Sequence, residues 1–271
     1  MGNSWFLSFG AAGSPRLRLV CFPFAGGSPA AFRSWASRLH GASEGAIEVV
    51  AVQAPGRGSR FGERPLVSLG AMADAIADAL PALGRAPLAF FGHSMGAHVA
   101  FEVARRLRRR GAPLPVQLVV SGARAPQLEP RPRGWHLLGD RALACEIERL
   151  GGTPAEVLQN PELLAIVLPL LRADFQALDT HVHEPEPPLE VPLRAFGGLA
   201  DLAVPFRDLD AWGAQSTHPV TTKSFPGGHF FLESARERVL AELSAVLERY
   251  LLDRPSLRMR ASRPSLHEAS A

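Results

Sequence analysis

Short, nearly continuous apolar runs alternate along the chain with longer stretches in which apolar residues recur at helical spacing. Runs of this kind are typical of strands buried on both faces of a parallel sheet. The pattern therefore predicts an α/β fold, with a mostly parallel sheet and helices on both of its faces. We expect strands at residues 17–22, 48–53, 88–91, 116–121, 193–196 and 220–225.

Amphipathic stretches predict the helices that connect these strands. Ser68 is expected to cap the second helix and Gly111 to end the third, because serine and glycine favour those two positions. We expect the helices at residues 29–39, 69–83, 97–110 and 235–252.

The segment between residues 121 and 193 interrupts this alternation with proline-rich ends and helical patterns at 140–150, 154–158 and 161–177. It is too long for an ordinary crossover, so residues from about 125 to 187 are predicted to be a helical lid over the functional site. The apolar residues of its last helix are expected mostly to pack on the core, and the alternative is that they line a substrate chamber. They are Leu163, Leu164, Ile166, Val167, Leu170 and Leu171.

The hydrophobic content of 46% supports a large core, and we expect residues 1–253 to form one domain. Residues 254–271 are rich in Pro, Ser and Arg, which predicts a disordered tail. No apolar run is long enough to span a bilayer, and the first residues lack the pattern of a signal peptide. The two cysteines, Cys21 and Cys145, are expected to be apolar fillers. These features predict a cytoplasmic protein with no membrane partner.

The formal net charge is only +3, but five arginines lie between residues 105 and 110, at the end of the third helix. Cations favour a helix C-terminus, so solvation and capping are the first interpretation, and a surface for an acidic partner is the second. The run contains no interleaved aromatic residue, and the chain has one tyrosine. Binding to nucleic acid is therefore not expected.

The pentapeptide Gly92-His93-Ser94-Met95-Gly96 lies between an expected strand and an expected helix. In that context G-x-S-x-G predicts a nucleophile elbow, a tight turn that projects the serine hydroxyl above the sheet. Asp201 and His229 follow later strands in the order serine, acid, histidine, which is the order of the α/β-hydrolase fold. Each alone would be an ordinary turn aspartate or loop histidine, but together they predict a catalytic triad.

A tetrahedral intermediate on Ser94 requires backbone donors for its oxyanion, and we expect them to be the N–H groups of Met95 and Ala25. Ala25 lies in the glycine-rich loop after the first strand. Such chemistry needs no cofactor and no metal. The one candidate metal cluster, His181 and His183 beside Glu184, is interpreted as a hinge loop of the lid, with a metal site as the alternative.

Four segments resemble the type II thioesterases, which are editing enzymes of polyketide synthases and non-ribosomal peptide synthetases. They are residues 21–27, the Pro-Gly-Arg-Gly segment of residues 54–58 with Arg60, the elbow, and residues 227–232. The resemblance covers residues 15 to 250. It implies hydrolysis of stalled or aberrant acyl groups from the phosphopantetheine arm of an acyl or peptidyl carrier protein.

The position of the acid distinguishes members of the wider superfamily. Thioesterase domains within synthases often carry the aspartate directly after the strand that follows the elbow, but here residues 121–128 contain no carboxylate and Glu129 is the first one after that strand. The acid is therefore expected to be Asp201, as in the separate enzymes. Asp208 and Asp210 are alternatives within an expected helix.

Two other functions stay open at this point: a serine esterase or lipase acting on free small esters or acyl-CoA, and a non-catalytic acyl-binding protein. If the partner is an acidic carrier, it should be steered by basic residues near the entrance. We expect Arg57, Arg60 and Arg64 to do this rather than the run at 105–110, because loops at the carboxyl ends of the strands surround the site.

Overall fold

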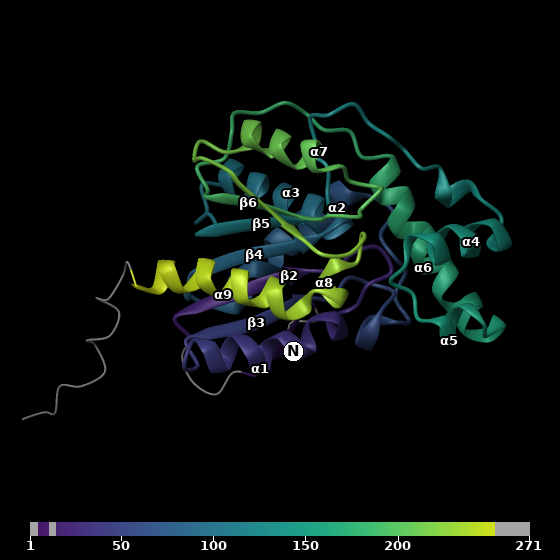
Figure 1. The fold of residues 1–271 in the computed structure, drawn as a ribbon, viewed down its shortest axis with the longest axis horizontal. Helices are drawn as coiled ribbons and strands as arrows, with labels where there is room; N and C mark the ends of the chain where they lie inside the picture. Colours follow the sequence, from purple (N-terminus) through teal and green to yellow (C-terminus); the bar gives the residue numbers. More distant parts are fainter. Residues whose placement is uncertain (1–4, 11–14, 253–271) are drawn as a thin grey trace, which may run out of the picture.

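The computed structural model describes residues 5–10 and 15–252. Its strands form one seven-stranded sheet in the order β1-β3-β2-β4-β5-β6-β7 (Figure 1). β1 pairs antiparallel with β3, and every other neighbouring pair is parallel. The strands are β1 (Phe6–Phe9), β2 (Leu17–Phe22), β3 (Ile47–Val52), β4 (Leu88–His93), β5 (Gln117–Ser121), β6 (Leu193–Gly198) and β7 (Thr221–Phe225).

The six expected strands are present, and β1 is the one that the pattern did not predict. β1 is four residues long and half-exposed at the sheet edge, so it lacks the continuous apolar run that marks the others. β4 and β6 extend two residues beyond their expected ends, to His93 and Gly198. Both extensions lie at the carboxyl edge of the sheet, next to the loops that carry the candidate catalytic residues.

Helices cover both faces of the sheet, as predicted. α2, α3 and α7 pack in one apolar cluster with Val20, Phe22 and Phe90, while α1 and α9 pack in another with Leu19 and Phe91. Neighbouring residues of a strand thus face opposite layers. The helices are α1 (Arg33–Ala42), α2 (Leu69–Ala79), α3 (Met95–Arg109), α7 (Phe206–Asp210), α8 (Phe231–Ser234) and α9 (Arg236–Leu252).

The predicted helix boundaries agree in part. Ser68 caps α2 through a hydrogen bond from the Ala71 N–H to its hydroxyl, and Gly111 follows α3 with a φ of +61°. The expected helix at 29–39 begins as a 3-10 turn, Pro29–Phe32, before α1. No helix in the described part of the chain is long and apolar enough to cross a membrane. The expected tail, residues 254–271, lies outside the described residues.

Between β5 and β6 the chain forms α4 (Asp140–Leu150), α5 (Ala155–Leu158) and α6 (Pro161–Asp179), preceded by a 3-10 turn at Trp135–Leu137. We call this group the insertion; it lies at one end of the sheet (Figure 1). It has its own small apolar cluster, and Pro169 lies inside α6. The cluster is formed by the buried residues Leu143, Ile147, Leu168, Leu171 and Phe175.

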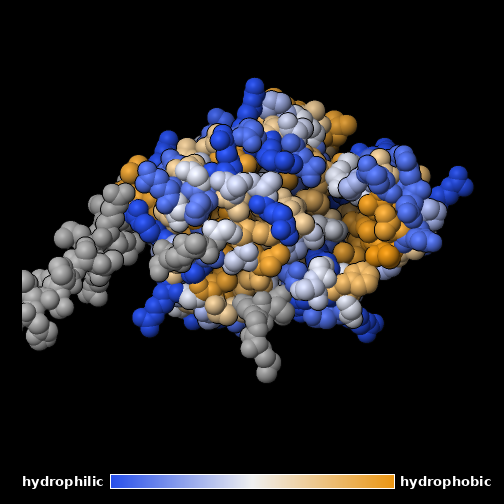
Figure 2. All heavy atoms as spheres, turned by 90° about the horizontal axis from the view of Figure 1, so that it is seen from below, coloured by the Kyte–Doolittle hydropathy of each residue, from blue (hydrophilic) through white to orange (hydrophobic). Residues whose placement is uncertain are grey.

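The apolar face of α6 packs less completely than expected. Leu171 is buried, whereas Leu163 and Ile166 are 40% and 50% exposed. Figure 2 shows hydrophobic surface gathered at the end of the molecule that the insertion forms. Leu163 and Ile166 are therefore exceptions to the packing expected for most of the six residues, because the first turns of α6 project beyond the rest of the fold.

Candidate active site

Ser94 occupies the turn between β4 and α3, with φ +53° and ψ −120°. Non-glycine residues adopt a positive φ rarely, and such strain is typical of a nucleophile elbow. A Cβ atom on Gly92 would lie 2.2 Å from the Gly96 carbonyl oxygen, and one on Gly96 would lie 2.1 Å from that of Phe22. The two glycines of the motif are therefore required by close backbone contacts around Ser94.

His229 lies between Ser94 and Asp201. Its Nε2 is 2.9 Å from the Ser94 Oγ, and its Nδ1 is 2.8 Å from the Asp201 Oδ2. The His229 and Asp201 side chains are 4% and 0% exposed, whereas Ser94 is partly open to solvent. The structure thus brings together the three residues that the sequence pattern selected, although they are far apart in the chain.

Asp201 is held by its own loop. Its Oδ1 accepts hydrogen bonds from the backbone N–H groups of Ala203 and Val204, which leaves Oδ2 directed at His229. The two alternative acids lie elsewhere. Asp208 forms an ion pair with Arg124, and Asp210 is the last residue of α7. Among the described residues, Asp201 is the carboxylate that contacts His229.

His93 was assigned no role from the sequence pattern, and in the structure it is fully buried beside the triad. Its Nδ1 is 2.9 Å from the Ser121 Oγ, and its ring centroid is 5.2 Å from that of His229. Burial lowers the pKa of His93 well below 6.5, and the nearby His229 lowers it further. His93 is consequently uncharged at neutral pH. The one feature of the sequence that could have indicated a role for His93 is its position inside the elbow motif, directly before Ser94.

The loop after β2 runs beside the elbow. Its tight turn is closed by a hydrogen bond from the Gly27 N–H to the Phe24 carbonyl. The Met95 N–H belongs to the first turn of α3, where backbone donors have no intrahelical acceptor. Within the described residues, the Ala25 N–H also has no hydrogen-bond acceptor. The N–H groups of Ala25 and Met95 are therefore free to donate, and their role toward an oxyanion stays a prediction.

The insertion reaches this site at two points. The Leu171 side chain of α6 covers Gly26, because a Cβ atom on that glycine would lie 2.5 Å from the Leu171 Cδ2. A Cβ on Gly152, after α4, would lie 2.3 Å from the ring of Phe230, the neighbour of His229. The insertion thus packs on both the glycine-rich loop and the histidine loop.

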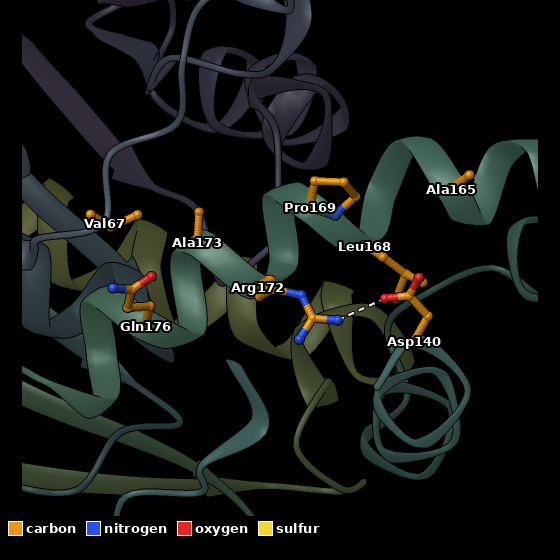
Figure 3. A pocket seen from close by; sticks show the side chains of 8 residues that line it. All are labelled: Val67, Asp140, Ala165, Leu168, Pro169, Arg172, Ala173 and Gln176. Atoms are coloured by element: carbon orange, nitrogen blue, oxygen red, sulfur yellow. Dashed lines mark hydrogen bonds and ion pairs between the residues drawn. The ribbon is translucent and has the colours of Figure 1, made fainter. Parts of the chain in front are cut away.

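A cavity of about 340 Å³ opens on another side of α6 (Figure 3). None of the three triad residues lines it. Arg172 crosses it and donates a hydrogen bond to Asp140, which ties α6 to the start of α4. The lining residues are Val67, Asp140, Ala165, Leu168, Pro169, Arg172, Ala173 and Gln176.

The expectation that Arg57 and Arg60 steer a partner was wrong. Arg57 is 5% exposed and forms an ion pair with Asp174 of α6. Arg60 is 9% exposed, pairs with Glu63 and stacks over the Trp5 ring at 4.4 Å. Both cations are occupied within the fold, and only the exposed Arg64 keeps its predicted role as a surface charge.

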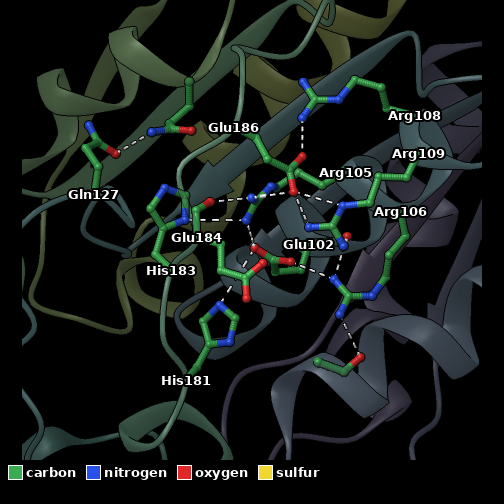
Figure 4. Close-up of polar contacts among 12 residues, drawn as sticks. Glu102, Arg105, Arg106, Arg108, Arg109, Gln127, His181, His183, Glu184 and Glu186 are labelled. Carbon is green, nitrogen blue, oxygen red and sulfur yellow. Dashed lines mark hydrogen bonds and ion pairs between the residues drawn. The ribbon is translucent and has the colours of Figure 1, made fainter.

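The arginine run at the end of α3 takes part in a network of ion pairs, drawn in Figure 4, although Arg109 and Arg110 are exposed to solvent as predicted. Arg105 is 2% exposed and pairs with Glu102 and Glu186, while Arg106 pairs with Glu102 and Asp74. Arg108 and Arg109 also bind Glu186, and Arg110 binds Asp78. Carboxylates of the same chain therefore balance the positive charge of this run, the buried Glu102 beside Arg105 and Arg106 and the exposed Asp78 beside Arg110.

His181 and His183 belong to the same network. His181 Nε2 is 3.7 Å from the Glu102 Oε1, and His183 Nδ1 is 3.5 Å from Arg105. Among the described residues, no group of three or more His, Cys, Asp or Glu side chains could hold a metal ion. Burial alone would raise the pKa of Glu102, but hydrogen bonds from His181 and the two arginines lower it to about 2.

The two cysteines differ from one another. Cys21 is fully buried in β2, as predicted, and burial raises the pKa of its thiol. Cys145 is exposed on α4, so its interpretation as an apolar filler was wrong.

Comparison with known proteins gives a consistent result. A model of the thioesterase domain family matches residues 17–247. The gramicidin S biosynthesis protein GrsT of Aneurinibacillus migulanus is 38% identical over 238 residues, which cover 88% of this chain and 91% of that protein.

Solved structures of thioesterases also resemble this chain over most of its length. RedJ, a thioesterase from the prodiginine pathway of Streptomyces coelicolor, is 43% identical, with a TM-score of 0.80 over 87% of this chain and 94% of that one. BorB, a type II thioesterase from the borrelidin biosynthetic cluster, is 35% identical, with a TM-score of 0.81 over 89% and 97%. The predicted α/β-hydrolase fold is thereby confirmed.

Proposed function

Because the chain belongs to the thioesterase domain family, among its type II thioesterases, we propose that it releases acyl groups from the phosphopantetheine arm of a carrier protein. Ser94 is the nucleophile, His229 the general base and Asp201 the residue that orients the imidazole. The observation that carries this proposal is the pair of contacts made by His229, at 2.9 Å to Ser94 and 2.8 Å to Asp201.

The reaction proceeds in two halves. His229 Nε2 takes the proton of the Ser94 hydroxyl as the Oγ attacks the thioester carbonyl carbon. The carbon–sulfur bond then breaks, and the imidazolium returns that proton to the departing pantetheine thiol. In the second half, His229 deprotonates a water that attacks the acyl-serine ester, which releases the carboxylic acid and restores Ser94.

Charge develops twice on the carbonyl oxygen, once in each half. The backbone N–H groups of Ala25 and Met95 are the proposed donors, since both lack an acceptor beside the elbow. The neutral state of His93 supports the same chemistry. A charged imidazole 5.2 Å away would oppose the positive charge that His229 must acquire.

The relatives support the proposed substrate class. GrsT is named for gramicidin S biosynthesis and RedJ for the prodiginine biosynthetic pathway, and type II thioesterases act on intermediates held as thioesters on acyl or peptidyl carriers. We assign this chain an editing role toward such carriers, in the cytoplasm, with no metal and no cofactor beyond the arm that bears the substrate.

The test compares one acyl group on three leaving groups: a holo-carrier protein, N-acetylcysteamine and an oxygen ester such as p-nitrophenol. We expect the highest kcat/KM for the carrier and a clear preference for it over N-acetylcysteamine. A preference for the oxygen ester would favour the esterase alternative. Binding of the acyl group without turnover of any of the three substrates would favour the non-catalytic alternative.

A further inference from the structure

A carboxylate from the insertion binds the backbone of the glycine-rich loop. Asp174, in the second half of α6, accepts a hydrogen bond from the Gly26 N–H at 2.7 Å through its Oδ2. The Asp174 side chain is fully buried. Gly26 directly follows Ala25, so the insertion holds the peptide group next to the one that is proposed to donate to the oxyanion.

Arg57 completes this contact from a third segment. Its Nη2 donates to the Asp174 Oδ1 at 2.8 Å, and its Nη1 donates both to Oδ2 at 3.1 Å and to the Gly27 carbonyl oxygen at 3.0 Å. The Arg57 side chain is 4% exposed. One guanidinium therefore joins α6 to the glycine-rich loop, in the two-pronged geometry that fixes a carboxylate most firmly.

Packing reinforces the same arrangement. Gly26 has a φ of +73°, and the space where a side chain would lie is filled by Leu171, three residues before Asp174 on α6. On Gly27 a Cβ atom would lie 2.8 Å from the Phe24 carbonyl oxygen. The glycine-rich loop is thus held by apolar contact with Leu171 and by hydrogen bonds to the Arg57–Asp174 pair.

A buried ion pair contributes little net stability, because the desolvation of two charges offsets most of their attraction. Its geometric effect is larger, since donors to a developing oxyanion must be held within about 0.5 Å of the productive position. An ion pair at this place is therefore better explained by control of the loop than by stabilisation of the fold.

We propose that Asp174 and Arg57 are positioning residues that direct the Ala25 N–H, so that the oxyanion hole is complete only while α6 is seated on the loop. This inference rests on the proposed function, and it adds that the insertion determines kcat and not access alone. Movement of α6 away from the loop would remove the Gly26 and Arg57 contacts together.

The primary variant is Asp174→Asn, which keeps the size of the side chain and removes its charge. With an acyl-N-acetylcysteamine substrate, we expect kcat to fall about 10- to 100-fold, less than the loss of a whole oxyanion donor, while KM changes less than about threefold. An alkyl boronic acid, which forms a tetrahedral adduct on Ser94, should lose affinity by a similar factor. If Asp174 only helped the protein to fold, kcat per functional active site and boronate affinity would not fall by the same factor.

Glu48→Gln is the matched control. Glu48 is a buried carboxylate paired with Arg18 at 2.6 Å, but the pair lies at the opposite edge of the sheet, where β2 and β3 begin. Per titrated active site, kcat and the boronate affinity of this variant should stay within about twofold of wild type. Leu171→Ala is a second test variant that keeps both charges, and it should lower kcat and boronate affinity together by a smaller factor.

The outcomes separate the two claims. If the wild type does not hydrolyse the thioester, the proposed function is wrong. If the wild type is active and folded Asp174→Asn matches it in kcat and boronate affinity, only the positioning role is wrong. The positioning role is also wrong if Asp174→Asn loses activity only because fewer of its molecules have a functional active site, as counted by active-site titration. Should Asp174→Asn fail to fold, unchanged kcat in Leu171→Ala overturns the inference.

Discussion

The two sides of the active site are held in different ways. Ser94, Asp201 and His229 follow strands β4, β6 and β7, each paired with a neighbour in a sheet whose core is fully buried. The insertion instead has a small cluster of its own and meets the glycine-rich loop through Leu171 and Asp174. The triad is therefore built on paired strands over the large core, whereas the Ala25 donor lies in a loop that is also held by the insertion and its smaller apolar cluster.

This difference predicts the largest effect for the sheet side. Ser94→Ala should lower kcat by about 10³-fold or more, because no nucleophile remains and only binding and the oxyanion donors still act. The melting temperature should stay near that of wild type, since one small residue replaces another. Near-normal thioester hydrolysis by the variant would end the assignment of Ser94.

Asp201→Asn should be damaging to a similar degree, about 10³-fold in kcat, since the imidazole loses both its orienting partner and the charge that stabilises its protonated form. Asp208→Asn is the matched control, because Asp208 pairs with Arg124 and not with His229. Steady-state rates of both variants decide the matter. A crippled Asp208→Asn beside an active Asp201→Asn would reverse the choice of acid.

The ion-pair network of α3 should affect stability and its pH dependence rather than activity. The pKa of Glu102 is about 2 in the folded chain, against an ordinary value of 4.5, so its stabilising effect is present above about pH 4.5 and lost as the pH falls toward 2. Glu102→Gln should therefore melt lower than wild type at pH 7, and the difference should shrink at pH 3. A difference in melting temperature that stays the same from pH 7 to pH 3 would contradict a stabilising role for the Glu102 charge.

The smallest effect is expected at the exposed start of α6. Ile166→Ser should change the free energy of unfolding by less than about 0.5 kcal/mol, because the side chain is half-exposed. Leu143→Ala, in the buried cluster of the insertion, should cost about 2–5 kcal/mol by comparison. Denaturant unfolding of both variants measures the contrast. A large loss in Ile166→Ser would show that this surface is packed in solution.

The sheet side was also the part that sequence could predict. Continuous apolar runs mark buried strands directly, and Gly92 and Gly96 mark the elbow because backbone contacts exclude any side chain there. Asp201 was found because triad order and strand-end position restrict the choice. β1 escaped prediction because a four-residue edge strand carries no comparable signal.

The arginines could not be interpreted from sequence in the same way. Arg57, Arg60 and Arg105 were expected on the surface because isolated charges are rarely buried, but each is buried against a carboxylate. Asp174 lies 117 residues after Arg57, and Glu186 lies 81 residues (186 − 105) after Arg105. Local pattern holds no information on pairs so distant, so these contacts required the folded structure.

The mechanism requires that Ser94 carries the acyl group between the two halves of the reaction. Rapid mixing of wild type with an acyl carrier, acid quenching and mass analysis of the digested protein test it directly. We expect a mass increase equal to the acyl group on the peptide that contains Ser94, formed within one turnover and absent from Ser94→Ala. Complete hydrolysis with no acylated peptide at any time point, at a similar rate in both proteins, would contradict it.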